Sequence, residues 1–499
     1  MKRQIAWVMA LLIAGAGALA SCGDSTAAPT DTDTAAVSES AVDSSTAVTE
    51  VLKKDNLPDN LDFGGEKITI HIRNGDNGNP EGNCVMEMTV EGLNGELLND
   101  AIYNRNLAVS ERLNVEIDPY VSYDWTQYGQ ALKEIRESIN AGDDMFDIIA
   151  GWCNGDVTNL ALEGCFLELD GVNYLDTKQP WWNQGLANAT PMGGKTFFVT
   201  GESNILTSLG SAFSVFVNEN IQNEFDLGSL ADYVIDGTWT IDKMSEIAKT
   251  VQNDLNGDGA IDADNDRVGL VLLNYISADA FYTSLDCHQI ESDNDGNLSY
   301  VPDIERIHTA LTKVVDLHYN NPGVLGWLPD ITRDIFVEGR ALMTLEYMEA
   351  AREQLRGMED SYYIIPMPKL DENQDQYYSY IFNNLTVQSV PVTNGNPDAT
   401  FATMEALASE SYYNVTPVFF EDCMQNKYAR SETTVQMLEI IRDSCYVDYE
   451  YIYGDLFRTP AFIFRDQVSR KKSDAASYIE KNSSKIESAI EKAMEQLGQ

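Results

Sequence analysis

The chain has 499 residues, with 79 Asp and Glu against 33 Lys and Arg, which gives a formal net charge of −46 at pH 7. Because so few cations are available to neutralise phosphates, the composition argues against binding to nucleic acid or to anionic lipid through a basic face. The length exceeds what one hydrophobic core usually serves, so we expect two lobes with separate cores.

The N-terminus is typical of an export signal that ends in a lipidation site. Two cationic residues precede the apolar run Ile5–Ala20, which is shorter than the roughly 20 residues that span a membrane comfortably. The run ends in Leu19-Ala20-Ser21-Cys22, the lipobox order in which small residues precede the cysteine that is acylated. We predict a signal peptide at 1–21 and lipidation of Cys22, which anchors the chain on the extracellular side of the cell membrane. An ordinary secretory signal or an uncleaved anchor is the alternative.

The segment 22–61 is rich in Ser, Thr, Ala and Asp and shows no apolar periodicity. Such a composition buries too little surface to offset the entropy of ordering, so we predict a disordered tether. Six further cysteines follow Cys22 without any spacing typical of zinc. The sequence is compatible with disulfides among these cysteines and equally with free thiols, as expected if the organism is anaerobic. They are Cys84, Cys153, Cys165, Cys287, Cys423 and Cys445.

The first ordered stretch alternates strands with helices, which predicts a parallel sheet. Strands are expected at 67–72, 115–117 and 146–150. Asn99 is expected to cap the helix between the first two strands, and Gly142 is expected to end the helix between the last two. Ligand loops follow the carboxyl ends of parallel strands, so the loops at 73–80 and 151–154 are candidate binding elements. Their candidate ligand-binding residues are Asn74, Asp76, Trp152 and Asn154.

The remaining elements follow in chain order and complete an α/β fold class with a large helical component. We expect strands at 212–217 and 341–345, a helix capped by Thr240, a hairpin turn at 293–297, a helix at 303–319 and mainly helices from 397 onward, including 483–497. Glu346 and Tyr347 directly follow an apolar strand, as Trp152 does, and are further candidates for ligand binding.

An acidic loop beginning at Asp254 has the spacing of a calcium-binding loop. Oxygen donors stand at alternating positions, a glycine occupies the sixth position, and either Asp264 or Asp266 must replace the missing acid at position twelve. We predict a structural Ca²⁺ ion here, while an acidic turn without metal is the alternative. The predicted ligands are Asp254, Asn256, Asp258, Ala260 through its carbonyl, Asp262 and Asp266.

Aromatic residues are the other signal, because sugars stack their C–H faces on such rings. Trp152 is placed to do so, whereas Trp181, Trp182 and Trp239 are expected in the core. The sequence has no GxSxG, HExxH or phosphate-loop motif. Its 79 carboxylates nevertheless allow a pair of acidic residues of the kind that catalyses glycoside hydrolysis.

Several stretches together resemble the extracellular solute-binding proteins of carbohydrate ABC transporters, of the family 1-like form common among Firmicutes. The resemblance covers most of residues 65–465. It rests on the segments 98–106, 180–183, 237–244, 254–269, 336–342, 365–371 and 404–408.

The resemblance implies a two-lobed periplasmic-binding-protein-like (type II) fold, with crossings near Thr200–Ser203 and Pro366–Pro368. The expected lobes are 62–199 with 333–366, and 200–332 with 367–499. It further implies a monomer without enzymatic activity that captures a sugar, in particular an oligosaccharide, and delivers it to ABC permease subunits. A surface polysaccharide-processing enzyme, such as a glycoside hydrolase, is the alternative.

Overall fold

The computed structural model describes residues 55–75, 83–124, 127–153, 157–187, 191–293, 295–381, 385–424, 432–457 and 460–497. The predicted signal peptide, Cys22 and the candidate residues Asp76 and Asn154 lie outside these ranges. Within them, no helix combines the length and the apolar character that crossing a membrane requires.

The folded body begins inside the segment that was predicted to be a tether. Asp55 and Leu57 are buried, and the Asp55 carboxylate accepts hydrogen bonds from both terminal nitrogens of Arg112, at 2.5 and 2.7 Å. The predicted boundary at residue 61 is therefore wrong. The buried leucine and the ion pair hold residues 55–61 against the folded body. The overall composition of the polar segment 22–61 does not reveal either contact.

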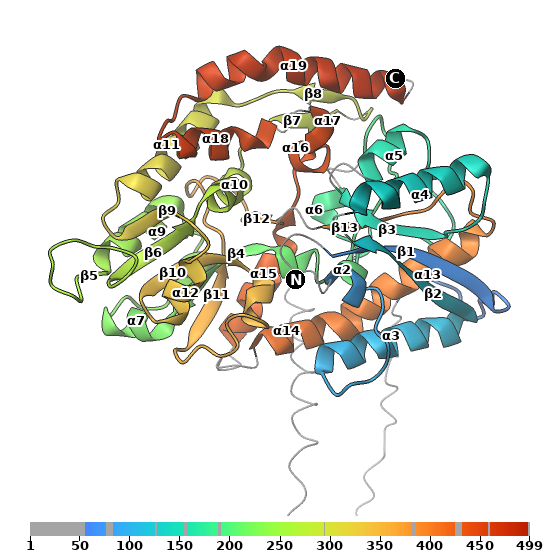
Figure 1. Cartoon of the computed structure of the whole chain (residues 1–499), viewed down its shortest axis with the longest axis horizontal. Coiled ribbons are helices and arrows are strands. Elements are labelled where there is room, and N and C mark those ends of the chain that lie inside the picture. Colours follow the sequence, from blue (N-terminus) through green and yellow to red (C-terminus); the bar gives the residue numbers. More distant parts are fainter. Residues whose placement is uncertain are drawn as a thin grey trace, which may run out of the picture. The chain divides into compact units, whose positions relative to one another are not determined.

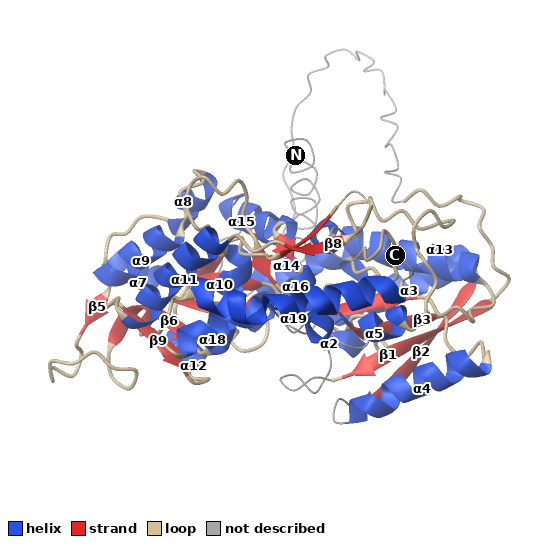
Figure 2. Cartoon of the chain, turned by 90° about the horizontal axis from the view of Figure 1, so that it is seen from above, coloured by secondary structure: helices blue, strands red, loops and turns tan. Residues whose placement is uncertain are grey.

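The first lobe is built on a four-stranded sheet in the order β13-β3-β1-β2 (Figure 1). The strands β2, β1 and β3 are parallel, as the strand–helix alternation predicts, and β13 joins them antiparallel to β3. Figure 2 shows α4 on one face of this sheet and α3 with α13 on the other. The elements are β1 Glu66–Asn74, α2 Asn83–Met86, α3 Leu97–Leu113, β2 Val115–Asp124, α4 Tyr128–Ala141, β3 Ile148–Trp152, α5 Thr158–Leu162, α6 Gln184–Ala187, β13 Thr386–Ser389 and α13 Pro397–Glu410.

Two predicted helix ends in this lobe have different outcomes. α4 ends where Gly142 adopts a φ of +75°, the left-handed conformation that glycine takes without strain, so this prediction is confirmed. Asn99 is not the cap of α3, which begins two residues earlier with Glu96 at its N-cap position. The Asn99 side chain instead donates to the carbonyl of Gly92, at 2.7 Å.

The second lobe contains a six-stranded mixed sheet in the order β11-β4-β10-β6-β5, with β9 also paired to β6. The Thr240 hydroxyl accepts a hydrogen bond from the backbone N–H of Lys243, which confirms it as the N-cap of α9. The elements are β4 Phe213–Asn218, α7 Glu219–Glu224, α8 Leu230–Ile235, α9 Ile241–Thr250, β5 Gln252–Asn253, β6 Arg267–Leu273, α10 Tyr275–Ser284, α11 Ile304–Tyr319, β9 Val324–Leu328, α12 Thr332–Val337, β10 Ala341–Tyr347 and β11 Tyr362–Pro366.

Strand pairing corrects the predicted division into lobes. The segment 333–366 belongs to the second lobe, because β10 pairs with β4 and β6 and β11 pairs with β4. The segment 386–410 belongs to the first, since β13 pairs with β3 and α13 packs on α3 and β1. The assignment was wrong because the residues of a strand do not indicate which distant strand it pairs with.

The chain passes between the sheets three times. The first passage follows Val199, which bridges to Gln388, and runs through the buried segment 200–212 to β4, in agreement with the predicted crossing. The predicted crossing at Pro366–Pro368 is wrong, because Ile381 still bridges to Ala212 and only Thr386 begins β13. The third passage runs from α13 through the π-helix Ser411–Val415 and α14 Thr416–Met424 to α15 Glu432–Asp443, which packs on β11.

The C-terminal elements form a small layer that packs on α10 and α11 of the second lobe. The predicted turn at 293–297 joins a two-stranded hairpin, and the predicted last helix begins earlier than expected, as α19 Ala475–Gln496. α19 packs on α11, α17 and β8, and Figure 1 shows it as the outermost helix of this layer. The other elements are β7 Ile290–Ser292, β8 Leu298–Tyr300, β12 Ser379–Tyr380, β14 Cys445–Tyr446, α16 Tyr449–Ile452, α17 Gly454–Phe457 and α18 Ile463–Ser469.

Candidate ligand-binding site

The first half of the candidate site lies at one edge of the first sheet. Asn74 ends β1 and Trp152 ends β3, and both strands run parallel toward this edge. Trp152 pairs directly with Thr386 of the antiparallel β13, and Arg73 Nε donates to the Thr386 hydroxyl at 3.0 Å. The half-buried Trp152 therefore lies opposite a threonine that binds a cation, a combination suited to a polar ligand with an apolar face.

The second half lies at the end of β10 in the other sheet. Glu346 is only 3% exposed, and its carboxylate accepts a hydrogen bond from Arg333 Nη2 of α12 at 2.9 Å. The same nitrogen lies 3.3 Å from the hydroxyl of Tyr347, and the guanidinium carbon is 5.8 Å from the centre of that ring. Burial raises the pKa of Glu346, and the positive charge of Arg333 opposes that rise.

Arg333 is a functional candidate that sequence reasoning missed. It belongs to a short helix with no motif, and only the fold brings it to the end of β10. Its Nε atom is buried and has no hydrogen-bond partner within the described residues. Since an unsatisfied buried donor is unfavourable, this atom is a natural place for a ligand oxygen.

Aromatic rings connect the second half of the site to the interior. Phe213 lies 5.9 Å from Tyr347 and 5.8 Å from Tyr380, and Tyr380 lies 5.0 Å from Tyr451, measured between ring centres. Phe213, Tyr380 and Tyr451 are buried, whereas Tyr347 is only partly buried. Tyr347 is therefore the ring of this series that keeps surface for a ligand, and the others fix its position.

A hydrogen-bonded network links the first half of the site to the crossing segment. The buried carboxylate of Glu87 accepts from the backbone N–H of Thr207 at 2.9 Å and from its hydroxyl at 2.8 Å. The Thr207 hydroxyl in turn accepts from the N–H of Thr386 at 3.1 Å, and Thr386 binds Arg73. Burial raises the pKa of Glu87 to about 7, while these hydrogen bonds and the charge of Arg73 act in the other direction.

The three tryptophans that were expected in the core are buried, as predicted. Trp181 and Trp182 both donate their indole N–H groups to Glu405, at 3.1 and 2.9 Å, and Trp239 donates to the carbonyl of Pro366 at 2.9 Å. The six described cysteines are also buried, and none of them forms a disulfide in this part of the chain.

The acidic loop folds into a series of turns. The two Asp254 carboxylate oxygens accept from the N–H groups of Gly257 and Gly259, at 2.6 and 2.8 Å. The buried carboxylate of Asp266 accepts from the backbone N–H of Leu255 at 2.8 Å and from that of Asp262 at 2.9 Å, so Asp266 holds the two sides of the loop together. No group of three or more His, Cys, Asp or Glu side chains in the described ranges is arranged to hold a metal ion.

No family model and no curated protein matches the chain. Solved structures nevertheless share its fold along most of its length. A family 1 extracellular solute-binding protein from Bifidobacterium longum subsp. infantis is 11% identical, with 84% of this chain and 100% of that chain covered and a TM-score of 0.52.

Two further structures give the same result. A cyclo/maltodextrin-binding protein, solved with maltotetraose, is 12% identical over 90% of this chain and 99% of that chain, with a TM-score of 0.51. The GacH receptor of Streptomyces glaucescens GLA.O, solved unliganded and with acarbose, is 14% identical over 86% of this chain and 99% of that chain, with a TM-score of 0.50. The chain therefore has the two-lobed, periplasmic-binding-protein-like fold of extracellular solute-binding proteins.

Proposed function

We propose that this chain is a lipid-anchored extracellular solute-binding protein that captures a carbohydrate and delivers it to an ABC permease. The observation that carries the proposal is that each of two separate sheets has an aromatic residue at the end of a strand. Trp152 in the first sheet pairs with Thr386, which binds Arg73, and Tyr347 in the second sheet lies within hydrogen-bond distance of Arg333. A ligand that contacts both sets favours a closed arrangement of the lobes, and such a difference is what a transporter can recognise.

The chemistry of the two halves suits a sugar. Trp152 and Tyr347 offer ring faces to C–H groups, and Arg333 Nε offers a donor to a hydroxyl oxygen. Two proteins of the same fold were solved with acarbose and with maltotetraose, which supports an oligosaccharide as the solute. Glu346 forms an ion pair with Arg333. A carboxylate in such a pair is better suited to positioning a ligand than to donating a proton in hydrolysis.

Titration calorimetry with a panel of neutral and acidic oligosaccharides, combined with analysis of the products, tests this proposal. We expect a sugar to bind in the micromolar range or tighter without being cleaved. Release of shortened sugars would instead establish the polysaccharide-processing alternative.

Trp152 provides the sharpest test of the site. In a Trp152→Ala variant, the Kd of the bound sugar should rise about tenfold or more, because the stacking surface is lost. A Trp152→Phe variant keeps an aromatic face and should retain most of the affinity. Equal affinity of both variants and the unaltered protein would remove Trp152 from the site.

The anchor is tested separately from binding. Cells supplied with a labelled fatty acid should incorporate the label into the protein, whereas a Cys22→Ala variant should carry no label and should be released from the membrane. Label on the variant would place the modification elsewhere.

We also propose that the acidic loop binds a structural Ca²⁺ ion. Asp254, Asn256, Asp258 and Asp262 stand at the spacing of a calcium loop, and Asp266 follows one residue after its twelfth position. Each carboxylate oxygen that accepts a backbone N–H retains a further lone pair for a cation. Calcium should raise the melting temperature of the protein but not that of an Asp254→Ala, Asp258→Ala variant. Asp293→Ala is the matched control, because Asp293 accepts from Asp295 and Asn297 in an acidic turn outside the loop. An unchanged calcium response in the double variant would refute the site.

A further inference from the structure

The second half of the site has a neighbour at the end of β6, the strand beside β10. The two strands are parallel, and Thr344 of β10 pairs with Val271 of β6. When this register is continued along both strands, Asn274 stands level with Tyr347 at the same edge of the sheet. The next residue, Tyr275, begins α10 and is 42% exposed. A polar and an aromatic side chain therefore follow β6, directly beside the end of β10.

Asn274 carries an oxygen that no group in the described part of the chain uses. An asparagine at the N-cap of a helix normally accepts a hydrogen bond from a backbone N–H of the first turn. Asn274 occupies this position of α10 without making that bond. Its Oδ1 atom is buried and has no hydrogen-bond partner within the described ranges. Since a buried acceptor without a donor is unfavourable, this oxygen is suited to a ligand hydroxyl, and it complements the free donor of Arg333.

An arginine of the C-terminal layer holds the ring of Tyr275 in place. The guanidinium carbon of Arg465, in α18, lies 4.6 Å from the centre of the Tyr275 ring and 3.7 Å from that of Phe462. Arg465 Nε donates to both carboxylate oxygens of Asp279 at 3.0 Å, and Nη2 donates to one of them. Asp279 lies in α10 and is only 1% exposed. This contact fixes the plane of the guanidinium group, which in turn limits the orientation of the ring.

The helix α10 connects this group to the aromatic rings of the site. It packs on β6, on α18 and on β12 (Figure 1). The strand β12 carries Tyr380, whose ring reaches Tyr347 through Phe213. Asn274 and Tyr275 are therefore joined to the end of β10 both through the sheet and through the core behind it.

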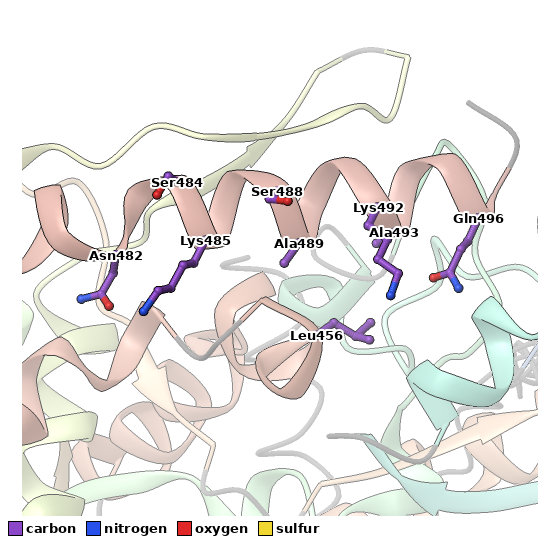
Figure 3. Close-up of a pocket in the computed structure, with 9 residues that line it drawn as sticks. All are labelled: Leu456, Asn482, Ser484, Lys485, Ser488, Ala489, Lys492, Ala493 and Gln496. Carbon is purple, nitrogen blue, oxygen red and sulfur yellow. The ribbon is translucent and has the colours of Figure 1, made fainter.

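The outer side of the C-terminal layer has no such connection. A cavity of about 880 Å³ lies against α19 (Figure 3), and its lining consists of Leu456 and residues of α19 itself. Among the described residues, none from the ends of β3, β6 or β10 lines it. Lys492, which Figure 3 shows in the wall of this cavity, is thus a cation of the same layer that stands outside the site.

We propose that Asn274 and Tyr275 bind the solute beside Tyr347, and that Arg465 is a positioning residue that orients Tyr275. This inference rests on the proposed function and extends its site to the end of β6. Asn274 Oδ1 accepts a hydrogen bond from a sugar hydroxyl, and the ring of Tyr275 packs on the apolar face of a sugar unit. Rings at the ends of two adjacent strands, with Trp152 in the other lobe, suit a chain of sugar units better than a monosaccharide.

Calorimetry of the mature protein with four tetrasaccharides tests the two contacts. The probes are maltotetraose, cellotetraose, xylotetraose and tetragalacturonate. The Kd of the probe that binds most tightly should rise about tenfold in a Tyr275→Ala variant, whereas Tyr275→Phe should retain most of the affinity. Asn274→Ala should raise the same Kd about threefold to tenfold, and Asn274→Asp, which keeps an acceptor oxygen, should raise it less.

Arg465 is tested through its dependence on Tyr275. Arg465→Lys keeps a positive charge for Asp279 but loses the planar group, so it should raise the Kd of the same probe several-fold. In a Tyr275→Ala background the same substitution should have no further effect on the Kd, because the ring through which Arg465 acts is missing. Equal effects in both backgrounds would show that Arg465 does not act through Tyr275.

Two control variants lie outside the proposed contacts. Tyr319→Ala removes a ring whose centre lies 4.6 Å from Lys471 Nζ, but Tyr319 ends α11 shortly before β9 begins and so stands at the other end of the parallel strands. Lys492→Gln removes the cation in the wall of the cavity against α19. Both variants should leave the Kd unchanged.

The outcomes separate this inference from the proposed function. Tight binding of a tetrasaccharide that is insensitive to Tyr275→Ala and to Asn274→Ala would overturn the inference and leave the proposed function intact. Binding of none of the four probes would count against both. A Kd that responds to only one of the two substitutions would remove the other residue from the site.

Discussion

At the scale of single residues, the pair of Arg333 and Glu346 is both an anchor and a candidate contact. Glu346 is nearly inaccessible, and Arg333 is the cation that compensates its charge at 2.9 Å. Removing one member of such a pair leaves the other charge buried, which is more harmful than removing both. The pair thus ties the stability of the β10 end to the chemistry of the site.

An Arg333→Met variant should lose about 3 kcal/mol of unfolding free energy in urea denaturation. Adding Glu346→Gln should recover part of this loss, because the uncompensated charge is then gone. Since burial raises the pKa of Glu346, the loss in the single variant should also shrink as the pH is lowered and the carboxyl becomes neutral. Equal stability of the single and double variants at every pH would show that the pair is not coupled.

At the scale of elements, α9 packs against β6 with almost no space between them. A Cβ atom added to Gly269 of β6 would lie 2.1 Å from the carbonyl oxygen of Ala248 and 2.3 Å from its Cα atom. Gly323, which precedes β9, meets the same carbonyl, where an added Cβ would lie 1.9 Å away. The helix can approach the sheet this closely only because both positions lack a side chain.

A Gly269→Ala variant should therefore lose more than about 2 kcal/mol of stability or fail to fold, since the added carbon meets backbone atoms that cannot move aside. Gly129→Ala in α4 is the matched substitution, because nothing lies within 4 Å of its added Cβ. It should raise the unfolding free energy by about 0.4–1 kcal/mol, as the unfolded chain becomes less flexible. Thermal denaturation of both variants checks the pair, and similar melting temperatures would contradict the close packing.

Elements whose signals are local could be predicted from the sequence, and those that depend on distant partners could not. Gly142 ends α4 and Thr240 caps α9 because the decisive contacts lie within a few residues. β10 was correctly predicted as a strand but was assigned to the wrong lobe. Its sheet is determined by pairing with β4, which lies more than 100 residues earlier in the chain. The same limit applies to the site: Trp152 could be placed by its strand, whereas Arg333 has no feature that points to Glu346.

At the scale of the whole molecule, buried ionisable groups and a large negative charge together set how stability depends on pH. Burial raises the pKa of Glu87 and of Glu405 to about 7, although hydrogen bonds oppose both shifts. Burial also lowers the pKa of His71 to about 4 and of His318 to about 3. Glu87 and Glu405 favour the folded state while their carboxyls are protonated. His71 and His318 favour it while their imidazoles are neutral.

These four groups have opposite effects on how the unfolding free energy depends on pH. Between about pH 4.5 and 7 the folded protein holds protons on Glu87 and Glu405 that the unfolded chain has lost, so their contribution to stability falls as the pH rises through this window, and repulsion within a chain of charge −46 adds to the fall. Between about pH 4 and 6.5 the unfolded chain takes up protons on His71 and His318 that the folded protein refuses, so their contribution to stability falls as the pH drops and offsets that of the two glutamates. The four groups together predict little net change in stability from about pH 4.5 to 6.5 and a decline above about pH 6.5.

Thermal denaturation from pH 5 to 8.5 in a buffer of constant ionic strength measures this curve. As the pH rises from 5 to about 7, a Glu87→Gln variant should lose less stability than the unaltered protein, by at most roughly 1.4 kcal/mol per pH unit, because one group with a raised pKa is removed. As the pH drops from about 6.5 to 5, the variant should lose more stability than the unaltered protein, because Glu87 no longer offsets the two histidines. A melting temperature that rises steadily from pH 6 to 8 would mean that Glu87 and Glu405 are ionised in the folded protein at pH 6, against the effect of their burial.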